Sequence, residues 1–83
     1  MEYVYMLECA DGSYYIGWTT DPEKRLKTHN SGRGAKYTRS RLPVRLVYIE
    51  AFEDRGAAKR REFALKKLSH RARAALAAEE GGI

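Results

Sequence analysis

Residues 3–18 constrain the fold more than any other part of the chain, because they read as two short strands joined by a tight turn. Apolar and aromatic residues occupy both faces of the segment 3–9, with Glu8 as its one charged residue, which is typical of a strand covered on both faces. Asp11 and Gly12 mark a turn, and residues 13–18 form the returning strand. We therefore predict a β-hairpin that other elements must cover on both sides.

The length of this turn decides where the tyrosines point. A two-residue turn would pair Tyr5 with Trp18 and place Tyr15 on the opposite face from Tyr5. A three-residue turn, with Gly12 in the left-handed conformation, pairs Tyr5 with Gly17 instead. That register gathers one coherent apolar layer, formed by Val4, Met6, Tyr14, Ile16 and Trp18. A one-residue slip would scatter the layer. We therefore predict the three-residue turn, with Tyr5 and Tyr15 side by side on the other face and Gly17 leaving open space beside Tyr5.

The rest of the chain carries regular start and stop signals. The elements predicted after the hairpin are, in order, a helix over 22–30, a loop over 32–42, a strand over 43–52, a helix over 56–68 and a helix from 70 to 81–82. Asp21, Asp54 and Ser69 precede the three helices as N-caps. The order ββαβαα predicts an α+β fold, with a small three-stranded antiparallel sheet flanked by helices. We expect residues 1–83 to form a single domain.

Two polar residues of the first predicted helix form a candidate site with the tyrosines. Arg25 and His29 are one turn apart and share a helix face, and Leu26 is the only large apolar residue of that helix. Simple solvation would explain the polar pair, and good packing in strands would explain the tyrosines. Because the strand of Tyr15 leads directly into this helix, we favour a joint site of phenols, a guanidinium and an imidazole. That set suits phosphodiester chemistry better than acyl transfer or redox work.

The charge of the chain points to a polyanionic partner. The chain has 16 Lys and Arg residues against 11 Asp and Glu, a net charge of +5, as is common in domains that bind nucleic acids. Residues 32–41 combine cations, glycines and an aromatic ring. We predict that this loop grips phosphates and stacks on a base, through Arg33, Lys36, Tyr37, Arg39 and Arg41. A merely solvated loop is the alternative.

One acidic residue and the single cysteine complete the chemical inventory. Glu62 lies at the margin of the apolar face of the helix over 56–68, where it could pair with Lys66. As a carboxylate brought beside the sheet, it could instead hold one hard divalent cation such as Mg²⁺, with water filling the other positions. Cys9 is the only cysteine, which excludes an internal disulfide and a cysteine-rich zinc site.

The ordered set of motifs resembles the GIY-YIG nuclease superfamily. Residues 3–5 look like the first signature, with Tyr in place of its Gly, and residues 15–17 match the second. Arg25 has the spacing of the family's catalytic arginine, and Glu62 matches its metal-binding glutamate. The resemblance covers nearly the whole chain. It is closest to the small stand-alone bacterial members of the UPF0213 type, whose loops read much like residues 29–38.

The resemblance implies a divalent-metal-dependent DNA endonuclease that hydrolyses phosphodiester bonds, in DNA repair or in the processing of branched or single-stranded DNA. Glu62 would hold a single Mg²⁺ or Mn²⁺ ion, and Arg25 would stabilise the negative charge that develops on the phosphoryl group. Tyr5 would accept a proton from the attacking water, Tyr15 would position that water, and His29 would assist the transfer. The sequence leaves open whether Tyr5 or His29 is the general base. The family's late Asn has no evident counterpart after Glu62.

Two functions from other classes remain open. A non-catalytic nucleic-acid-binding module would keep the basic loop and tolerate loss of Glu62, and an accessory interaction domain would need neither. No stretch approaches the roughly 20 apolar residues that cross a bilayer. We therefore expect a cytoplasmic protein without membrane contact, and a monomer.

Overall fold

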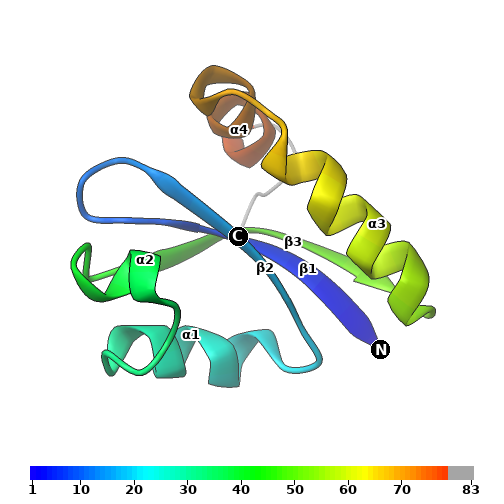
Figure 1. Ribbon diagram of the computed structural model, residues 1–83, viewed down its shortest axis with the longest axis horizontal. Coiled ribbons are helices and arrows are strands. Elements are labelled where there is room, and N and C mark those ends of the chain that lie inside the picture. Colours follow the sequence, from blue (N-terminus) through cyan, green and yellow to red (C-terminus); the bar gives the residue numbers. More distant parts are fainter. Residues whose placement is uncertain (79–83) are drawn as a thin grey trace.

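The computed structural model describes residues 1–78 and shows helices on both faces of one small sheet (Figure 1). The sheet is antiparallel, with strand order β2-β1-β3. Its strands are β1 (Glu2–Glu8), β2 (Tyr14–Thr19) and β3 (Arg45–Phe52). One face is covered by α1 (Pro22–Asn30) and α2 (Lys36–Arg39), and the other by α3 (Arg55–Lys66) and α4 (His70–Leu76). The predicted α+β fold is confirmed. None of the helices within residues 1–78 is long and apolar enough to cross a membrane.

The hairpin has the register predicted from the apolar layer. Tyr5 pairs with Gly17, and Leu7 pairs with Tyr15. Gly12 adopts a φ of 84°, a left-handed conformation that glycine adopts without steric cost. The three-residue turn is therefore correct, and it places Tyr5 and Tyr15 on the same face of the sheet.

The central strand β1 is buried on both faces, as its run of apolar residues predicts. Val4 and Met6 pack into a cluster with Ala58 and Leu65 of α3. Tyr5, Leu7 and Cys9 form the opposite cluster with Val44, and Tyr15, Leu26, Leu42 and Leu46 pack against it. Full burial of one such large apolar side chain stabilises the fold by about 1.5–3 kcal/mol. A single strand therefore anchors both helical layers.

The structure corrects the prediction for α1. Its only large apolar residue is Leu26, and plain solvation of its polar face was the simple explanation of Arg25 and His29. However, His29 is fully buried. The end of α1 is also tied to the start of the next strand, because the side-chain amide of Asn30 bonds both the N–H and the carbonyl of Val44, at 2.8 and 2.9 Å. Polar side chains, rather than an apolar stripe, hold α1 in place.

The helix α2 lies inside the segment that we predicted to be a loop. The observed order is therefore ββααβαα rather than ββαβαα. A helix of four residues spans about one turn, too short to show a hydrophobic period. Its third residue, Thr38, is fully buried.

The predicted N-caps are confirmed by hydrogen bonds to the first turns. The side chains of Asp21, Asp54 and Ser69 accept from the backbone N–H groups of Lys24, Ala57 and Ala72, at 3.1, 2.9 and 3.1 Å. The predicted end of the last helix at 81–82 lies outside the described residues.

Candidate active site

The structure brings the Tyr5 hydroxyl, the His29 imidazole and the Arg25 guanidinium into direct contact. The Tyr5 hydroxyl oxygen lies 2.9 Å from Nε2 of His29. Nε of Arg25 donates a longer hydrogen bond, of 3.4 Å, to the same oxygen. Tyr5 is 2% exposed and His29 is 0% exposed. Of the two, only Tyr5 retains any accessible surface.

Tyr15 completes the group of four residues selected from the sequence. Its ring centroid lies 5.2 Å from the His29 ring and 6.4 Å from the Tyr5 ring. Unlike these two residues, Tyr15 is only partly buried. The strand register delivers both tyrosines to the face that α1 covers, and the one-turn spacing on α1 delivers Arg25 and His29 to them.

Two glycines allow these rings to lie against the backbone. We expected open space beside Tyr5 at Gly17, and this expectation is wrong, because the phenol itself fills that space. A Cβ atom at Gly17 would lie 2.5 Å from the Tyr5 hydroxyl oxygen. A Cβ atom at Gly34 would collide with Nδ1 of His29 and would lie 2.7 Å from its Cγ. Any side chain at either position would displace the Tyr5–His29 pair.

Burial sets the protonation states of the pair. It raises the pKa of Tyr5 above its ordinary value; the hydrogen bond from Arg25 opposes this, and the charges of Tyr15 and Glu62 add to it. Burial also lowers the pKa of His29, and the Arg25 charge lowers it further. Arg25 favours the phenolate, but burial outweighs its effect. Near neutral pH the site therefore holds a protonated phenol beside a neutral imidazole.

The other side of the His29 ring contacts a residue that sequence reasoning missed. Oγ1 of Thr38 lies 2.9 Å from Nδ1 of His29 and donates to the carbonyl of Ala35 at 2.9 Å. Thr38 stands in a stretch dominated by Arg and Lys, and no local pattern distinguishes it from a solvated hydroxyl. Only the fold reveals that this residue is buried.

The residues of the predicted basic loop divide into two groups. Arg41 is used within the fold: it pairs with Asp11 at 3.0 Å, donates to the Tyr37 carbonyl at 2.7 Å, and lies 3.9 Å from the centre of the Tyr37 ring. Tyr37 in turn stacks on Tyr15, with ring centroids 6.2 Å apart. The remaining loop cations, Arg33, Lys36 and Arg39, are exposed to solvent.

Glu62 comes from α3, on the other side of the sheet. Its side chain is 22% exposed and pairs with Lys66 at 3.0 Å. Its charge contributes to the raised pKa of Tyr5, so Glu62 acts electrostatically on the same site. Residues 1–78 contain no cluster of three or more His, Cys, Asp or Glu side chains that could hold a metal. A single carboxylate nevertheless fits Mg²⁺, which keeps several of its water ligands and often uses one or two protein carboxylates.

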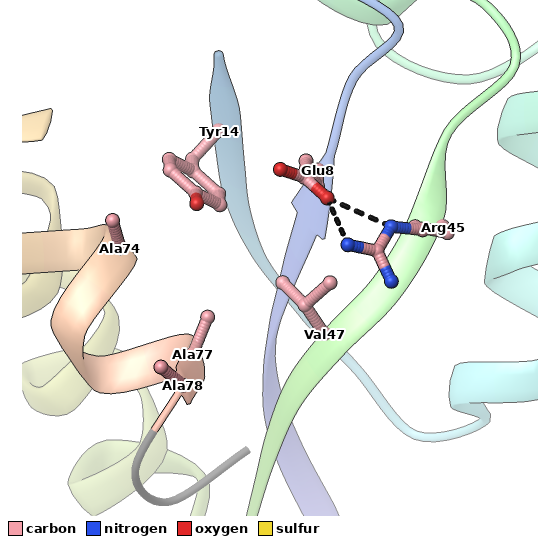
Figure 2. Close-up of a pocket in the computed structure, with 7 residues that line it drawn as sticks. All are labelled: Glu8, Tyr14, Arg45, Val47, Ala74, Ala77 and Ala78. Atoms are coloured by element: carbon pink, nitrogen blue, oxygen red, sulfur yellow. Dashed lines mark hydrogen bonds and ion pairs between the residues drawn. The ribbon is translucent and has the colours of Figure 1, made fainter. Parts of the chain in front are cut away.

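The pockets of the described residues differ in whether candidate site residues line them. A pocket of about 240 Å³ lies beside the tyrosines, lined by Tyr14, Tyr15, Ile16, Tyr37, Lys66 and Arg73. Figure 2 shows a pocket of about 250 Å³ next to α4, which contains none of the predicted site residues. There Glu8 and Arg45 pair with each other, and the α4 side presents only alanines. Of the four candidate catalytic residues, Tyr15 lines the first pocket, and Arg25 lines a third pocket of about 210 Å³ at the start of α1.

Comparisons with known proteins agree on one family. Residues 1–74 match the model of the GIY-YIG catalytic domain, a stretch that contains every residue of the candidate site. A UPF0213 protein of Clostridium perfringens is 58% identical over 69 residues, covering 83% of this chain and 74% of that protein. A UPF0213 protein of Halobacterium salinarum is 50% identical over 76 residues, covering 92% and 99%. The solution NMR structure of a UPF0213 protein from Bacillus halodurans is 52% identical, with a TM-score of 0.63 over 99% of this chain and 88% of that one.

Proposed function

Because the chain belongs to the GIY-YIG family, a family of nucleases, we propose that it is an endonuclease that hydrolyses DNA phosphodiester bonds with the help of one divalent cation. The observation that supports this most is the buried hydrogen bond between Tyr5 and His29, with Arg25 beside it. A phenol that is held against a neutral imidazole can lose its proton without a strongly basic group. Such a pair is suited to activating water.

Tyr5 is the better candidate for the group that contacts the attacking water. His29 is fully buried, so a substrate cannot reach it directly. Tyr5 would take a proton from water while its own proton passes to His29. Arg25 would donate hydrogen bonds to the phosphoryl oxygens as negative charge develops on them, and Tyr15, partly exposed beside the pair, would orient the water.

Glu62 is the residue that would hold the cation, either Mg²⁺ or Mn²⁺. When bound, the cation would offset negative charge on the phosphate and its leaving group. Lys66 would have to release the carboxylate first, because the two side chains are paired. Glu62 alone among the proposed site residues comes from the α3 side of the sheet.

DNA would lie across the pocket beside the tyrosines. The exposed cations Arg33, Lys36 and Arg39 would contact phosphates. Tyr37, which is 39% exposed, would stack on an unpaired base in place of the Arg41 guanidinium that now lies over its ring. An aromatic platform of this kind favours single-stranded or branched DNA as substrate. We also propose DNA repair or processing as the setting, and a cytoplasmic monomer as the form of the protein.

Cleavage of supercoiled, single-stranded and branched DNA would test the proposal. We expect cleavage with Mg²⁺ or Mn²⁺, and none in excess chelator. Glu62→Ala and Tyr5→Phe should abolish cleavage while the far-UV spectrum stays native. The matched controls are Glu53→Ala, at an exposed acid outside the site, and Tyr3→Phe, on the same strand as Tyr5. Full activity of folded Glu62→Ala would reject the metal role, and DNA binding without cleavage under any condition would favour a non-catalytic binding module.

A further inference from the structure

The buried hydroxyl of Thr38 has one proton and two neighbours that compete for it. Its Oγ1 lies 2.9 Å from the carbonyl oxygen of Ala35 and 2.9 Å from Nδ1 of His29. A carbonyl oxygen can only accept a hydrogen bond, whereas an imidazole nitrogen can donate or accept. The proton of Thr38 is therefore donated to Ala35, and only a lone pair of Oγ1 faces His29.

The tautomer of His29 follows from this count. Because Thr38 offers a lone pair, Nδ1 of His29 must carry a proton and donate it. A neutral imidazole has one N–H, so Nε2 is unprotonated and accepts from the Tyr5 hydroxyl at 2.9 Å. The hydrogen bonds therefore run in one direction, from Tyr5 through His29 and Thr38 to the carbonyl of Ala35.

We propose that Thr38 is a positioning residue that fixes His29 in the Nδ1–H tautomer, so that Nε2 is free to take the proton of Tyr5. The catalytic consequence rests on the proposed nuclease function, but the tautomer itself does not.

In the reaction the O–H bond of Tyr5 breaks and an N–H bond forms at Nε2. The phenolate takes a proton from water, and the water oxygen bonds to phosphorus while the bond to the leaving oxygen breaks. Solvent protonates the leaving oxygen. Tyr5 then releases the proton taken from water to solvent and regains its own proton from His29, which restores the starting state.

The same arrangement stabilises the charged ring that this transfer creates. The groups that face the ring are Tyr5 from β1, Tyr15 from β2, Arg25 from α1 and Thr38 from α2. The positive charge of Arg25 opposes protonation of His29. Thr38 favours it, because the hydroxyl and the carbonyl behind it both point their negative ends toward the ring.

Ring ¹⁵N NMR measures the tautomer directly, without any assay of cleavage. The chain has 2 histidines, so the spectrum of His70→Gln assigns the signals of His29. In the wild type we expect a protonated Nδ1 and an unprotonated Nε2. In Thr38→Val the Nδ1–H group would lose its acceptor, and the proton should move to Nε2, where the Tyr5 oxygen can accept it. Thr38→Ser keeps the hydroxyl and should restore the wild-type signals.

The matched control is Thr28→Val, which removes the same hydroxyl from a partly exposed residue of α1, where that hydroxyl donates to the Lys24 carbonyl of its own helix. General acid–base catalysis typically contributes on the order of 100- to 10,000-fold, so we expect Thr38→Val to lower the cleavage rate at least about tenfold. Thr28→Val and Thr38→Ser should stay near the wild-type rate. The acid limb of the pH–rate profile should change in Thr38→Val alone.

Either of two results would overturn the proposal: Nε2–H in the wild type, or an unchanged Nδ1–H signal in folded Thr38→Val. If Thr38→Val does not fold, the wild-type spectrum still decides whether the tautomer is the one inferred, and Thr38→Ser decides whether a hydroxyl is sufficient. If even the wild type cleaves no DNA while the ring signals behave as expected, the nuclease proposal fails and the assignment of the tautomer stands.

Discussion

At the scale of single residues, the site depends on how closely two rings approach the backbone. Gly34→Ala would place a methyl group against the His29 ring, within 2.8 Å of its Cα. Because the ring is fully buried and cannot retreat, we expect a loss of about 1–3 kcal/mol in the free energy of unfolding, together with loss of cleavage. Denaturant titration measures the first effect.

Gly56→Ala is the control for that substitution. There the nearest atoms are the ends of two flexible side chains, Asp54 Oδ2 at 3.1 Å and Arg60 Nη1 at 3.3 Å, and alanine is the better helix former. We expect Gly56→Ala to keep or slightly raise stability. Equal losses in the two variants would mean that the His29 contact has no special importance.

The buried imidazole also predicts how stability depends on pH. Burial in the folded state lowers the pKa of His29 below its ordinary value of 6.5. Above that value His29 is neutral in both states and contributes nothing. As the pH falls from about 7 toward 5, the unfolded chain binds a proton that the folded state does not, so the free energy of unfolding should decrease. Denaturant titrations across this range should show the decrease in His70→Gln as in the wild type, and a flat profile would contradict the burial of a neutral His29.

At the scale of elements, α3 carries both the proposed metal ligand, Glu62, and a lysine that competes with the metal for its carboxylate. Lys66 holds the Glu62 carboxylate in an i,i+4 ion pair, which typically contributes about 0.3–0.5 kcal/mol. Lys66→Met should release the carboxylate and raise the affinity for Mn²⁺ about twofold or more. Paramagnetic broadening of NMR signals near Glu62 measures this binding directly.

Lys67→Met is the control, because Lys67 lies over the Phe63 ring, 4.4 Å from its centre, rather than against the carboxylate. Its replacement removes the same charge from the next residue, the C-cap of α3. If both variants bind Mn²⁺ equally more tightly, the gain comes from net charge, and the Glu62–Lys66 pair does not compete with the metal.

The α2 segment offers a second test, in which its cations differ in role. Lys36 and Arg39 are exposed and are free to contact phosphates. Each phosphate contact contributes roughly 0.7–0.9 to the slope of log affinity against log salt concentration. Replacing both residues with Ala should therefore flatten that slope by between about one and two units. Arg41 is held by Asp11 and Tyr37. Arg41→Ala should therefore loosen this segment and leave the slope nearly unchanged. The reverse pattern would make Arg41 the phosphate contact.

The elements and the contacts differ in how far the sequence predicts them. Alternating side chains and a glycine turn determined the hairpin register, and helix spacing brought Arg25 and His29 together, because both are local rules. The burial of His29 did not follow, since a polar residue on a polar face carries no signal of burial. The contacts of Thr38 and Gly34 with His29 depend on how α2 packs against α1, and no local period records that packing.

At the scale of the whole molecule, the candidate site draws on both helical layers. Tyr5 and Tyr15 face the layer of α1 and α2, while Glu62 comes from the α3 layer, whose helix also packs against the hairpin (Figure 1). With strand order β2-β1-β3, β2 is an edge strand, and the pocket beside it is lined from both layers by Tyr37 and Lys66.

The four-residue helix α2 bears on whether the site and the sheet unfold together. Short surface elements open locally at a lower free energy than core strands do. Any such opening of α2 would separate Thr38 from His29 and leave the ring without its acceptor, while β1 and its two apolar clusters remained intact. The path of hydrogen bonds from Tyr5 to Ala35 would therefore be lost whenever this one helical turn opens. Under mild denaturing conditions, cleavage activity would fall before the sheet unfolds.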